Sequence, residues 1–379
     1  MRTLRPARPR PVTPTGQTVC LCMIVKNEAH VVRRCLASVR PIIDRWIVVD
    51  TGSSDGTQER VRAAMAGLPG EVIERPWRDF GQNRSEALAL ARGHGDYTLI
   101  IDADDELVLA PGYALPALSA DSYTIDITYA GSAYRRPQLI RNALPWRYRG
   151  VLHEFLDCPE AVTQNHLPIL MRIHHEGARS TDPTTYARDA AVLERALRTE
   201  TDPLLVARYT FYLGQSYRDC GQFAEALDAY LRRAELGHWV EEVYVSLLQA
   251  GRMMERLGRP PDLILATYAR ASAAVPGRAE AAHAASRLCR VLFRYAQGRS
   301  VAEPALGLPA PADGLFVESW IYAYGLYDEF AVNAYWCGRH RECLDACLRA
   351  LQGGQVPEAE HRRFLANMRF ALDRLPRAP

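Results

Sequence analysis

The 379-residue sequence predicts an α/β protein, in which a mixed sheet with helices on both faces precedes an all-α domain of helical repeats. From Thr18 to about Arg179, short apolar runs alternate with helical patterns, as in sheets whose parallel strands are joined by covering helices. From Pro183 onward Gly and Pro become sparse and apolar residues recur at helical spacing. We therefore expect a flexible basic tail at 1–17, an α/β domain at 18–180 and a helical domain at 181–379.

The composition is that of an ordinary globular protein, with 48% hydrophobic and 24% charged residues. The net charge of +2 argues against a nucleic-acid binder. No apolar run approaches the ~18 residues of a membrane span, and the basic tail lacks the apolar stretch of a secretory signal. The nine Cys form no metal-binding or disulfide pattern and favour a reducing compartment. We expect a cytoplasmic, bacterial-type protein, with peripheral membrane association and oligomeric state left open.

The first domain can be followed element by element along the chain. Strands are expected at 19–25, 46–49, 72–73 and 97–101, with helices around 31–39, after 57 and at 85–92. Alternating or apolar patterns then predict strands at 123–129, 138–141 and 169–173. Ligands of such sheets bind beyond the carboxyl ends of the strands, so the polar loops after Val25, Val49 and Ile101 should lie together.

The second domain contains a repeated helical pattern. Residues 212–221 and 250–258 are each followed by small residues and a Tyr, and a third, weaker copy runs from 335 to 351. The pattern resembles tetratricopeptide repeats, whose stacked helix pairs often present a concave surface to peptides. The stretch rich in Pro and Gly from 298 to 314 is expected to be a loop.

An acidic cluster, Asp102-Ala103-Asp104-Asp105-Glu106, directly follows the expected strand 97–101. Four carboxylates in five residues repel one another unless something offsets their charge. A divalent cation that is shared with substrate phosphates would do so. The alternative is a solvated acidic turn.

Three motifs in order resemble family 2 glycosyltransferases of GT-A fold, whose sheet is Rossmann-like. They are Met23-Ile24-Val25-Lys26-Asn27-Glu28, the Asp-x-Gly-Ser-x-Asp-Gly-Thr-like stretch 48–57, and the Asp-x-Asp motif at 102–104. The resemblance covers about residues 18–180. It implies a nucleotide-sugar donor, with UDP favoured, and Mn²⁺ or Mg²⁺ as cofactor.

The resemblance also implies site residues. Asp50 would contact the nucleoside, Asp104 would bind the metal on the diphosphate, and Asp102 would lie near the ribose or the metal. The full set expected to bind the nucleotide-sugar is Val25, Asn27, Glu28, Asp50, Gly52, Arg84, Asp102 and Ala103. Within the second motif, Asp55 and Gln58 have the spacing of a capping box, which favours a role in shaping the loop.

Two later segments resemble those of glycosyltransferases that carry helical repeats: 148–154, which ends in His153-Glu154, and 173–177, which contains His174-His175. In the second, His175 matches the position of a third metal ligand, and His174 could substitute for it. Glu154 is the candidate general base, because an acceptor hydroxyl or thiol loses its proton during attack. A hydrogen-bonded core His175 and a salt-bridged Glu154 are the alternatives.

Together these features predict a metal-dependent glycosyltransferase that inverts at the anomeric carbon. Its acceptor is expected to be a peptide, a protein or a saccharide, selected by the helical array. Two other functions stay open: a helical-repeat scaffold with a degenerate transferase domain, and a nucleotidyltransferase on a related sheet. The intact Asp50, Asp102 and Asp104 argue against the scaffold. The absence of a Gly-rich loop after Val25 argues against the nucleotidyltransferase.

Overall fold

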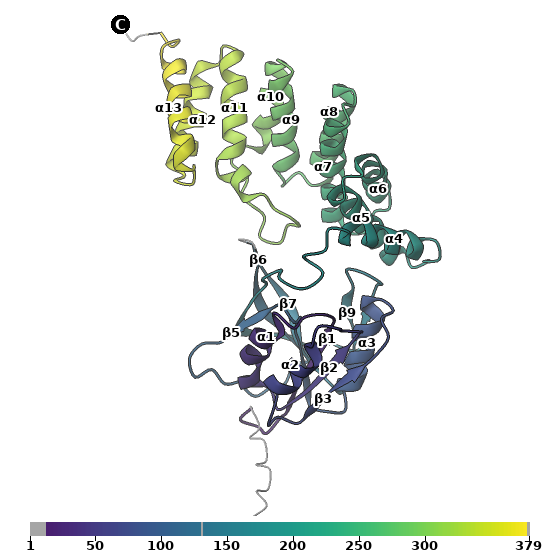
Figure 1. Cartoon of the computed structure of the whole chain (residues 1–379). Helices are drawn as coiled ribbons and strands as arrows, with labels where there is room; N and C mark the ends of the chain where they lie inside the picture. Colours follow the sequence, from purple (N-terminus) through teal and green to yellow (C-terminus); the bar gives the residue numbers. More distant parts are fainter. Residues whose placement is uncertain (1–12, 130–131, 377–379) are drawn as a thin grey trace, which may run out of the picture. The chain divides into compact units, whose positions relative to one another are not determined.

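The computed structural model describes residues 13–129 and 132–376, which fall into two compact units that divide between Arg188 and Asp189 (Figure 1). The first unit is built around an eight-stranded sheet and the second is all-α. The predicted fold class is therefore confirmed.

The sheet of the first unit has the strand order β3-β2-β1-β4-β7-β6-β10-β5. Strands β1 to β4 are mutually parallel, β7 runs antiparallel to β4 and β6, β10 is parallel to β6, and β5 is antiparallel to β10. Two short strands form a separate antiparallel ribbon, β8–β9. The bounds are β1 Val19–Val25, β2 Arg45–Asp50, β3 Gly70–Glu74, β4 Tyr97–Ile100, β5 Glu106–Val108, β6 Ser122–Tyr129, β7 Ser132–Arg141, β8 Arg147–Arg149, β9 Phe155–Asp157 and β10 Gln164–Arg172.

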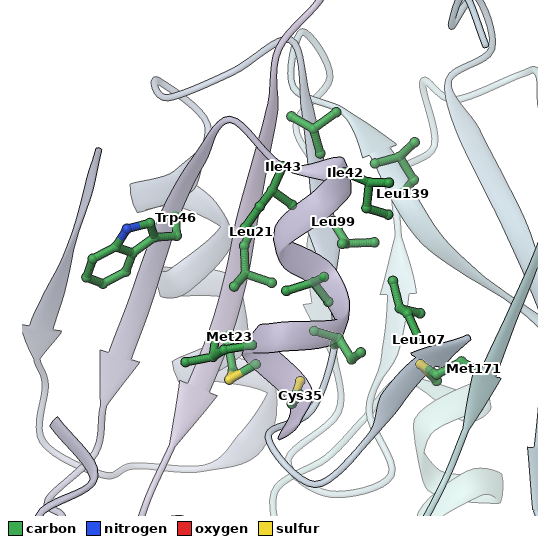
Figure 2. Packing of buried hydrophobic residues seen from close by; sticks show 14 of the residues in the cluster. Leu21, Met23, Cys35, Ile42, Ile43, Trp46, Leu99, Leu107, Leu139 and Met171 are labelled. Atoms are coloured by element: carbon green, nitrogen blue, oxygen red, sulfur yellow. The ribbon is translucent and has the colours of Figure 1, made fainter. Parts of the chain in front are cut away.

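Helices cover both faces of this sheet. Helix α1 (Val32–Val39) buries an apolar stripe against one face, together with α2 (Thr57–Ala64), and α3 (Phe80–Ala91) packs on the other. Figure 2 shows the first core, in which Cys35 of α1 lies over Leu21 and Met23 of β1. Cys20 and Cys22 of the same strand pack with α3 instead, because alternate side chains of a strand point to opposite faces.

The second unit is an array of sequential helices that pack as antiparallel neighbours (Figure 1). Glycines allow the first helix of a pair to approach a Tyr of the second: a Cβ at Gly214 would lie 2.9 Å from Tyr230, and one at Gly251 only 2.3 Å from Tyr268. The same Gly–Tyr contact thus recurs in the two best repeats. The bounds are α4 Thr185–Leu197, α5 Pro203–Asp219, α6 Phe223–Glu235, α7 Val240–Arg256, α8 Pro261–Ala274, α9 Glu280–Val291, α10 Tyr295–Ala302, α11 Leu326–Trp336, α12 His340–Gln352 and α13 Glu358–Leu372.

Three local expectations need correction or completion. The predicted loop 298–314 begins only after a helix that continues to Ala302 and a 3-10 turn that ends at Ala305. Gly298 belongs to that helix, where a Cβ would meet Asn333 Oδ1 at 2.6 Å, so its small size serves packing. Helix α3 starts at Phe80 instead of Ser85, because Asp79 caps it by accepting from Gln82 N. Strand β5 was not predicted.

Two further features concern the tail and the cysteines. Gln17 hydrogen-bonds both backbone groups of Leu118, at 2.8 and 2.9 Å, so the part of the predicted tail nearest the sheet is packed. The rest of that tail, residues 1–12, lies outside the described residues. All nine Cys are free thiols, and seven of them are buried. Within the described ranges, no helix is both long and apolar enough to cross a membrane.

Candidate functional site

The two loops that follow the carboxyl ends of β1 and β2 are joined by hydrogen bonds. Asn27 N donates to Ser53 Oγ and Ser54 N donates to Asn27 Oδ1, both at 2.9 Å. Glu28 N donates to Thr57 Oγ1, also at 2.9 Å. Asn27 has a φ of +58°, a left-handed conformation that is uncommon for a residue other than Gly and often marks a functional loop.

Asp50 ends β2 and is 1% exposed. Its Oδ1 accepts from Gly52 N and Ser53 N, each at 2.8 Å, in a turn where Gly52 has a φ of +108°. No donor among the described residues reaches its buried Oδ2. A buried acceptor without a partner is costly, so this oxygen is available to a ligand N–H or O–H.

Asp55 shapes the second loop, but the expected capping box is wrong. Its Oδ1 accepts from Thr57 N at 3.1 Å and its Oδ2 from Ala29 N at 3.0 Å. The first residue before α2 is Gly56, and the Gln58 side chain donates to Glu74 instead of returning to Asp55. Asp55 therefore joins the β1 and β2 loops.

Arg84 connects the acidic cluster to the 148–154 segment. Its Nη2 lies 2.7 Å from Asp102 Oδ1, and its Nε lies 2.7 Å from Glu154 Oε1. The side chains of Arg84 and Glu154 are only 14% and 11% exposed. Burial raises the pKa of Asp102, but the charges of Arg84 and Arg136 outweigh it and lower that pKa overall. Asp102 is thus held ionised, and one oxygen of Glu154 is engaged in an ion pair.

Two other carboxyl groups at this edge lack such a cation. Burial raises the pKa of Asp105 to about 8, and the charges of Asp102 and Asp104 add to the shift. Burial also raises the pKa of Glu28 to about 7, with further contributions from Asp104 and Asp55. The Oε2 of Glu28 is buried and accepts no hydrogen bond from any described residue. The cations at this edge therefore do not keep all of its carboxyl groups ionised near neutral pH.

A strap, residues 174–178 after β10, crosses this acidic edge. Gly177 N donates to Asp104 Oδ2 at 3.0 Å, and Ala178 N donates to Glu28 Oε1 at 3.3 Å. Arg34 of α1 fastens the strap by pairing with Glu176 at 2.6 Å while it donates to Asp104 O at 2.9 Å. Sequence reasoning missed Arg34, because an exposed Arg on an amphipathic helix carries no local signal of such a role.

The two His residues of the strap are placed differently. His174 Nε2 lies 3.0 Å from Glu106 Oε2, so His174 is engaged away from Asp104. His175 is exposed, has a φ of +53° and lies two residues before Gly177. His153 also has a positive φ, of +51°. These left-handed residues, with Asn27, lie in the segments that sequence reasoning singled out.

The side chains present suit a divalent cation. Within the ranges described, no three His, Cys, Asp or Glu side chains are already grouped as a metal site. However, Glu28 Oε2 is an orphaned buried oxygen, and the raised pKa of Asp105 shows that the negative charges of Asp102 and Asp104 are felt at this edge. Carboxylate oxygens are the ligands that Mg²⁺ and Mn²⁺ prefer, and Mg²⁺ usually keeps several waters and needs few protein ligands.

Comparison with known proteins covers part of the chain. Residues 20–112 match the family model described as Glycosyl transferase family 2. A TPR repeat-containing protein of Synechococcus elongatus is 38% identical over 148 residues, which are 37% of this chain and 35% of that protein. An uncharacterized glycosyltransferase of Rickettsia felis is 40% identical over 85 residues, 22% of this chain and 28% of that protein.

A glucosyl-3-phosphoglycerate synthase of Mycolicibacterium paratuberculosis is 27% identical over 137 residues, 34% of this chain and 40% of that protein. The chain spans about a third of the length of these curated relatives. Among solved structures, MamA is similar with a TM-score of 0.36 and 14% identity, over 45% of this chain and 90% of that chain. YrrB, titled a TPR protein with an unusual peptide-binding site, has a TM-score of 0.35 and 16% identity, over 48% of this chain and 84% of that chain.

Proposed function

We propose that the glycosyl transferase family 2 domain at residues 20–112 belongs to a metal-dependent enzyme that moves a sugar from a nucleotide-sugar to an acceptor. The observation that carries this proposal is the pair of buried carboxylate oxygens without a partner, Asp50 Oδ2 and Glu28 Oε2, at the carboxyl edge. Asp50 Oδ2 suits a nucleoside N–H and Glu28 Oε2 suits a cation. A nucleotide-sugar that is bound through a metal supplies both.

The donor would lie along the carboxyl ends of β2, β1 and β4. Asp50 Oδ2 accepts from the nucleobase, and uracil, which carries an imide N–H, is the favoured base. The interlocked loops that hold Val25, Asn27 and Gly52 form the floor of the nucleoside subsite. Ala103, between the two Asp of the motif, packs its methyl group in the core of the first unit, so any contact with the ribose would come from its backbone.

Asp104 and His175 would hold Mn²⁺ or Mg²⁺ on the diphosphate, with Glu28 as a further carboxylate. A bound cation would neutralise the charge that develops on the departing nucleoside diphosphate. Arg84 sits one ion pair away from this cluster, through Asp102, and its guanidinium can donate to a phosphate or sugar oxygen.

Glu154 is the proposed general base for an inverting attack. Its Oε1 pairs with Arg84, so Oε2 would have to take the acceptor proton. The same ion pair supports a second role, in which Glu154 and Asp102 together hold Arg84 in position. Glu154→Gln, which keeps the shape of the side chain, separates the role of general base from that of holding Arg84.

The acceptor is proposed to be a peptide, a protein or a saccharide that the second unit selects. The repeated Gly–Tyr helix contacts support a repeat array, and such arrays commonly bind peptides. The similarity to a synthase named for glucosyl transfer to 3-phosphoglycerate keeps small polar acceptors open. A cytoplasmic location is part of the proposal, because activated nucleotide donors are made there.

A thermal-shift screen tests the proposal. UDP, GDP, ADP and CDP are added with and without Mn²⁺, and one of them should raise the melting temperature only when the metal is present. Asp104→Asn should remove the metal-dependent part, with at least a ~10-fold loss of affinity. Asp126→Asn, at a partly exposed position on β6 where the carboxylate pairs with Arg135, is the matched control. Donor hydrolysis that persists in excess chelator would contradict metal dependence.

A further inference from the structure

Trp77 is a large aromatic side chain that stays 41% exposed at the carboxyl edge of the sheet. It lies three residues after β3, which ends at Glu74. Arg75, the first residue after β3, donates its backbone N–H to Asp50 O at 2.9 Å, and this hydrogen bond fastens the loop to the end of β2. The loop that carries this exposed indole is therefore fastened to the end of β2, the strand that carries Asp50.

The backbone on both sides of Trp77 is fixed by Asn83. This side chain is 0% exposed. Its Oδ1 accepts from Arg78 N at 2.9 Å, and its Nδ2 donates to Pro76 O at 3.1 Å. Asn83 therefore holds the loop instead of facing a ligand, and Trp77 is positioned before any ligand arrives. Such preorganisation lowers the entropic cost of binding.

The ring of Trp77 belongs to a small aromatic cluster. It meets Phe80 in a T-shaped contact with centroids 4.7 Å apart, and the Arg179 guanidinium lies 5.0 Å from the Phe80 centroid. Phe80 is the first residue of α3, and Arg84 follows one turn later on the same helix face. The cluster therefore lies at the start of the helix that also carries Arg84, whose guanidinium pairs with Asp102.

We propose that Trp77 stacks on the nucleobase of the donor while Asp50 Oδ2 accepts an N–H from the edge of that base. The inference rests on the proposed function, and it names a specificity element within it. A base presents two flat faces and a polar edge. The indole is complementary to a flat face, and the buried Asp50 oxygen is complementary to an N–H on the edge. Stacking tolerates every base, and each common base carries an N–H donor, so the Asp50 oxygen would select by the position of that donor on the base edge.

Isothermal titration of the full chain tests the role of Trp77. The nucleoside diphosphate that binds best with Mn²⁺ is retested as its 5′-monophosphate without metal, and pyrophosphate with Mn²⁺ reports the phosphate part alone. Trp77→Ala should weaken monophosphate binding about 5- to 100-fold and leave pyrophosphate unchanged. Trp77→Phe should recover most of the affinity. Trp239→Ala, at a 48% exposed Trp of the second unit, is the matched control.

The outcomes separate this inference from the proposed function. If wild type binds a nucleoside diphosphate and Trp77→Ala binds its monophosphate equally well, stacking is wrong and the function stands. If Trp77→Ala loses pyrophosphate to the same extent, Trp77 supports the shape of the whole site, and stacking is again wrong. If wild type binds none of the four diphosphates, both proposals are overturned.

Discussion

At the scale of single residues, the site is organised by how each carboxylate is compensated. Asp102 has the Arg84 guanidinium at 2.7 Å, while Asp104 accepts from the backbone N–H of Gly177 and Glu28 from that of Ala178. A cation-paired carboxylate is less available as a metal ligand than one held by neutral donors. This difference supports our proposal that Asp104, with Glu28 as a further carboxylate, holds the metal while Asp102 orients Arg84.

Glu154→Gln separates a base from a positioning residue. The amide keeps the size of the carboxylate but removes its basic oxygens, so turnover should fall by ~10²–10⁴-fold if Glu154 is the base. Nucleoside diphosphate affinity should stay within about threefold, because the metal ligands are untouched. Sugar-transfer assays measure the turnover rate, and isothermal titration measures the affinity for the nucleoside diphosphate. Near-normal turnover would reject Glu154 as base and direct attention to Asp157 and Glu176.

Stability without metal should fall as pH rises through neutrality. Burial raises the pKa of Asp105 to about 8 and that of Glu28 to about 7 in the folded protein, well above the values of an unfolded chain. Between about pH 4 and pH 8 the native state therefore holds more protons than the unfolded state, and raising the pH favours unfolding. The melting temperature should drop by about 2–8 °C from pH 5.5 to pH 8.5.

Asp105→Asn provides the control for that pH dependence, because the amide cannot ionise. The variant should show a flatter dependence of melting temperature on pH. Mn²⁺ should stabilise the wild type more at pH 8 than at pH 5.5, since it offsets the ionised carboxylates. A melting temperature that rises steadily across this range in chelator would show that other groups dominate.

At the scale of elements, what the sequence could predict depended on how local each signal was. Buried strands such as Val19–Val25 stood out because they are continuous apolar runs, and their carboxyl-end loops followed from the parallel arrangement. The resemblance pointed to segment 173–177, but the backbone hydrogen bonds of Gly177 and Ala178 to Asp104 and Glu28 could not be predicted, because they join residues far apart in sequence. Likewise, Gly298 suggested a loop, because its close approach to Asn333 is a tertiary contact that the local sequence does not reveal.

Gly177→Ala tests the strap. A Cβ at Gly177 would lie 3.0 Å from Asp104 Oδ2 and 3.2 Å from Glu28 Oε1, which is too close, and we expect the strap to move away from both carboxylates. Hydrogen exchange at residues 177 and 178 should speed up about tenfold or more, and metal-dependent nucleotide binding should weaken. Gly93→Ala is the matched control, since nothing lies within 4 Å of its Cβ. Unchanged exchange at the strap would show that the carboxylates yield instead.

At the scale of the whole molecule, each unit carries its own hydrophobic cores. The two clusters of the first unit lie on the two faces of the sheet, and the two clusters of the second follow its helices. The second unit also buries ion pairs, among them Arg278 with Glu280 at 2.9 Å, which are costly to desolvate and require a well-defined fold around them. Neither unit therefore depends on the other for a core.

This independence allows the acceptor role of the helical unit to be tested by separation. A fragment of residues 1–184, which ends before α4 begins at Thr185, retains the carboxyl edge and the strap. It should bind nucleoside diphosphate with Mn²⁺ within about threefold of the full chain and still hydrolyse the donor slowly. Transfer to the natural acceptor should fall at least ~100-fold, because acceptor binding energy that is lost lowers the rate as well as the affinity.

Adding residues 185–379 as a separate chain should not restore the rate at micromolar concentration, since the effective concentration supplied by covalent linkage is in the millimolar range. Transfer by the fragment at the full rate would show that the acceptor is recognised within the first unit.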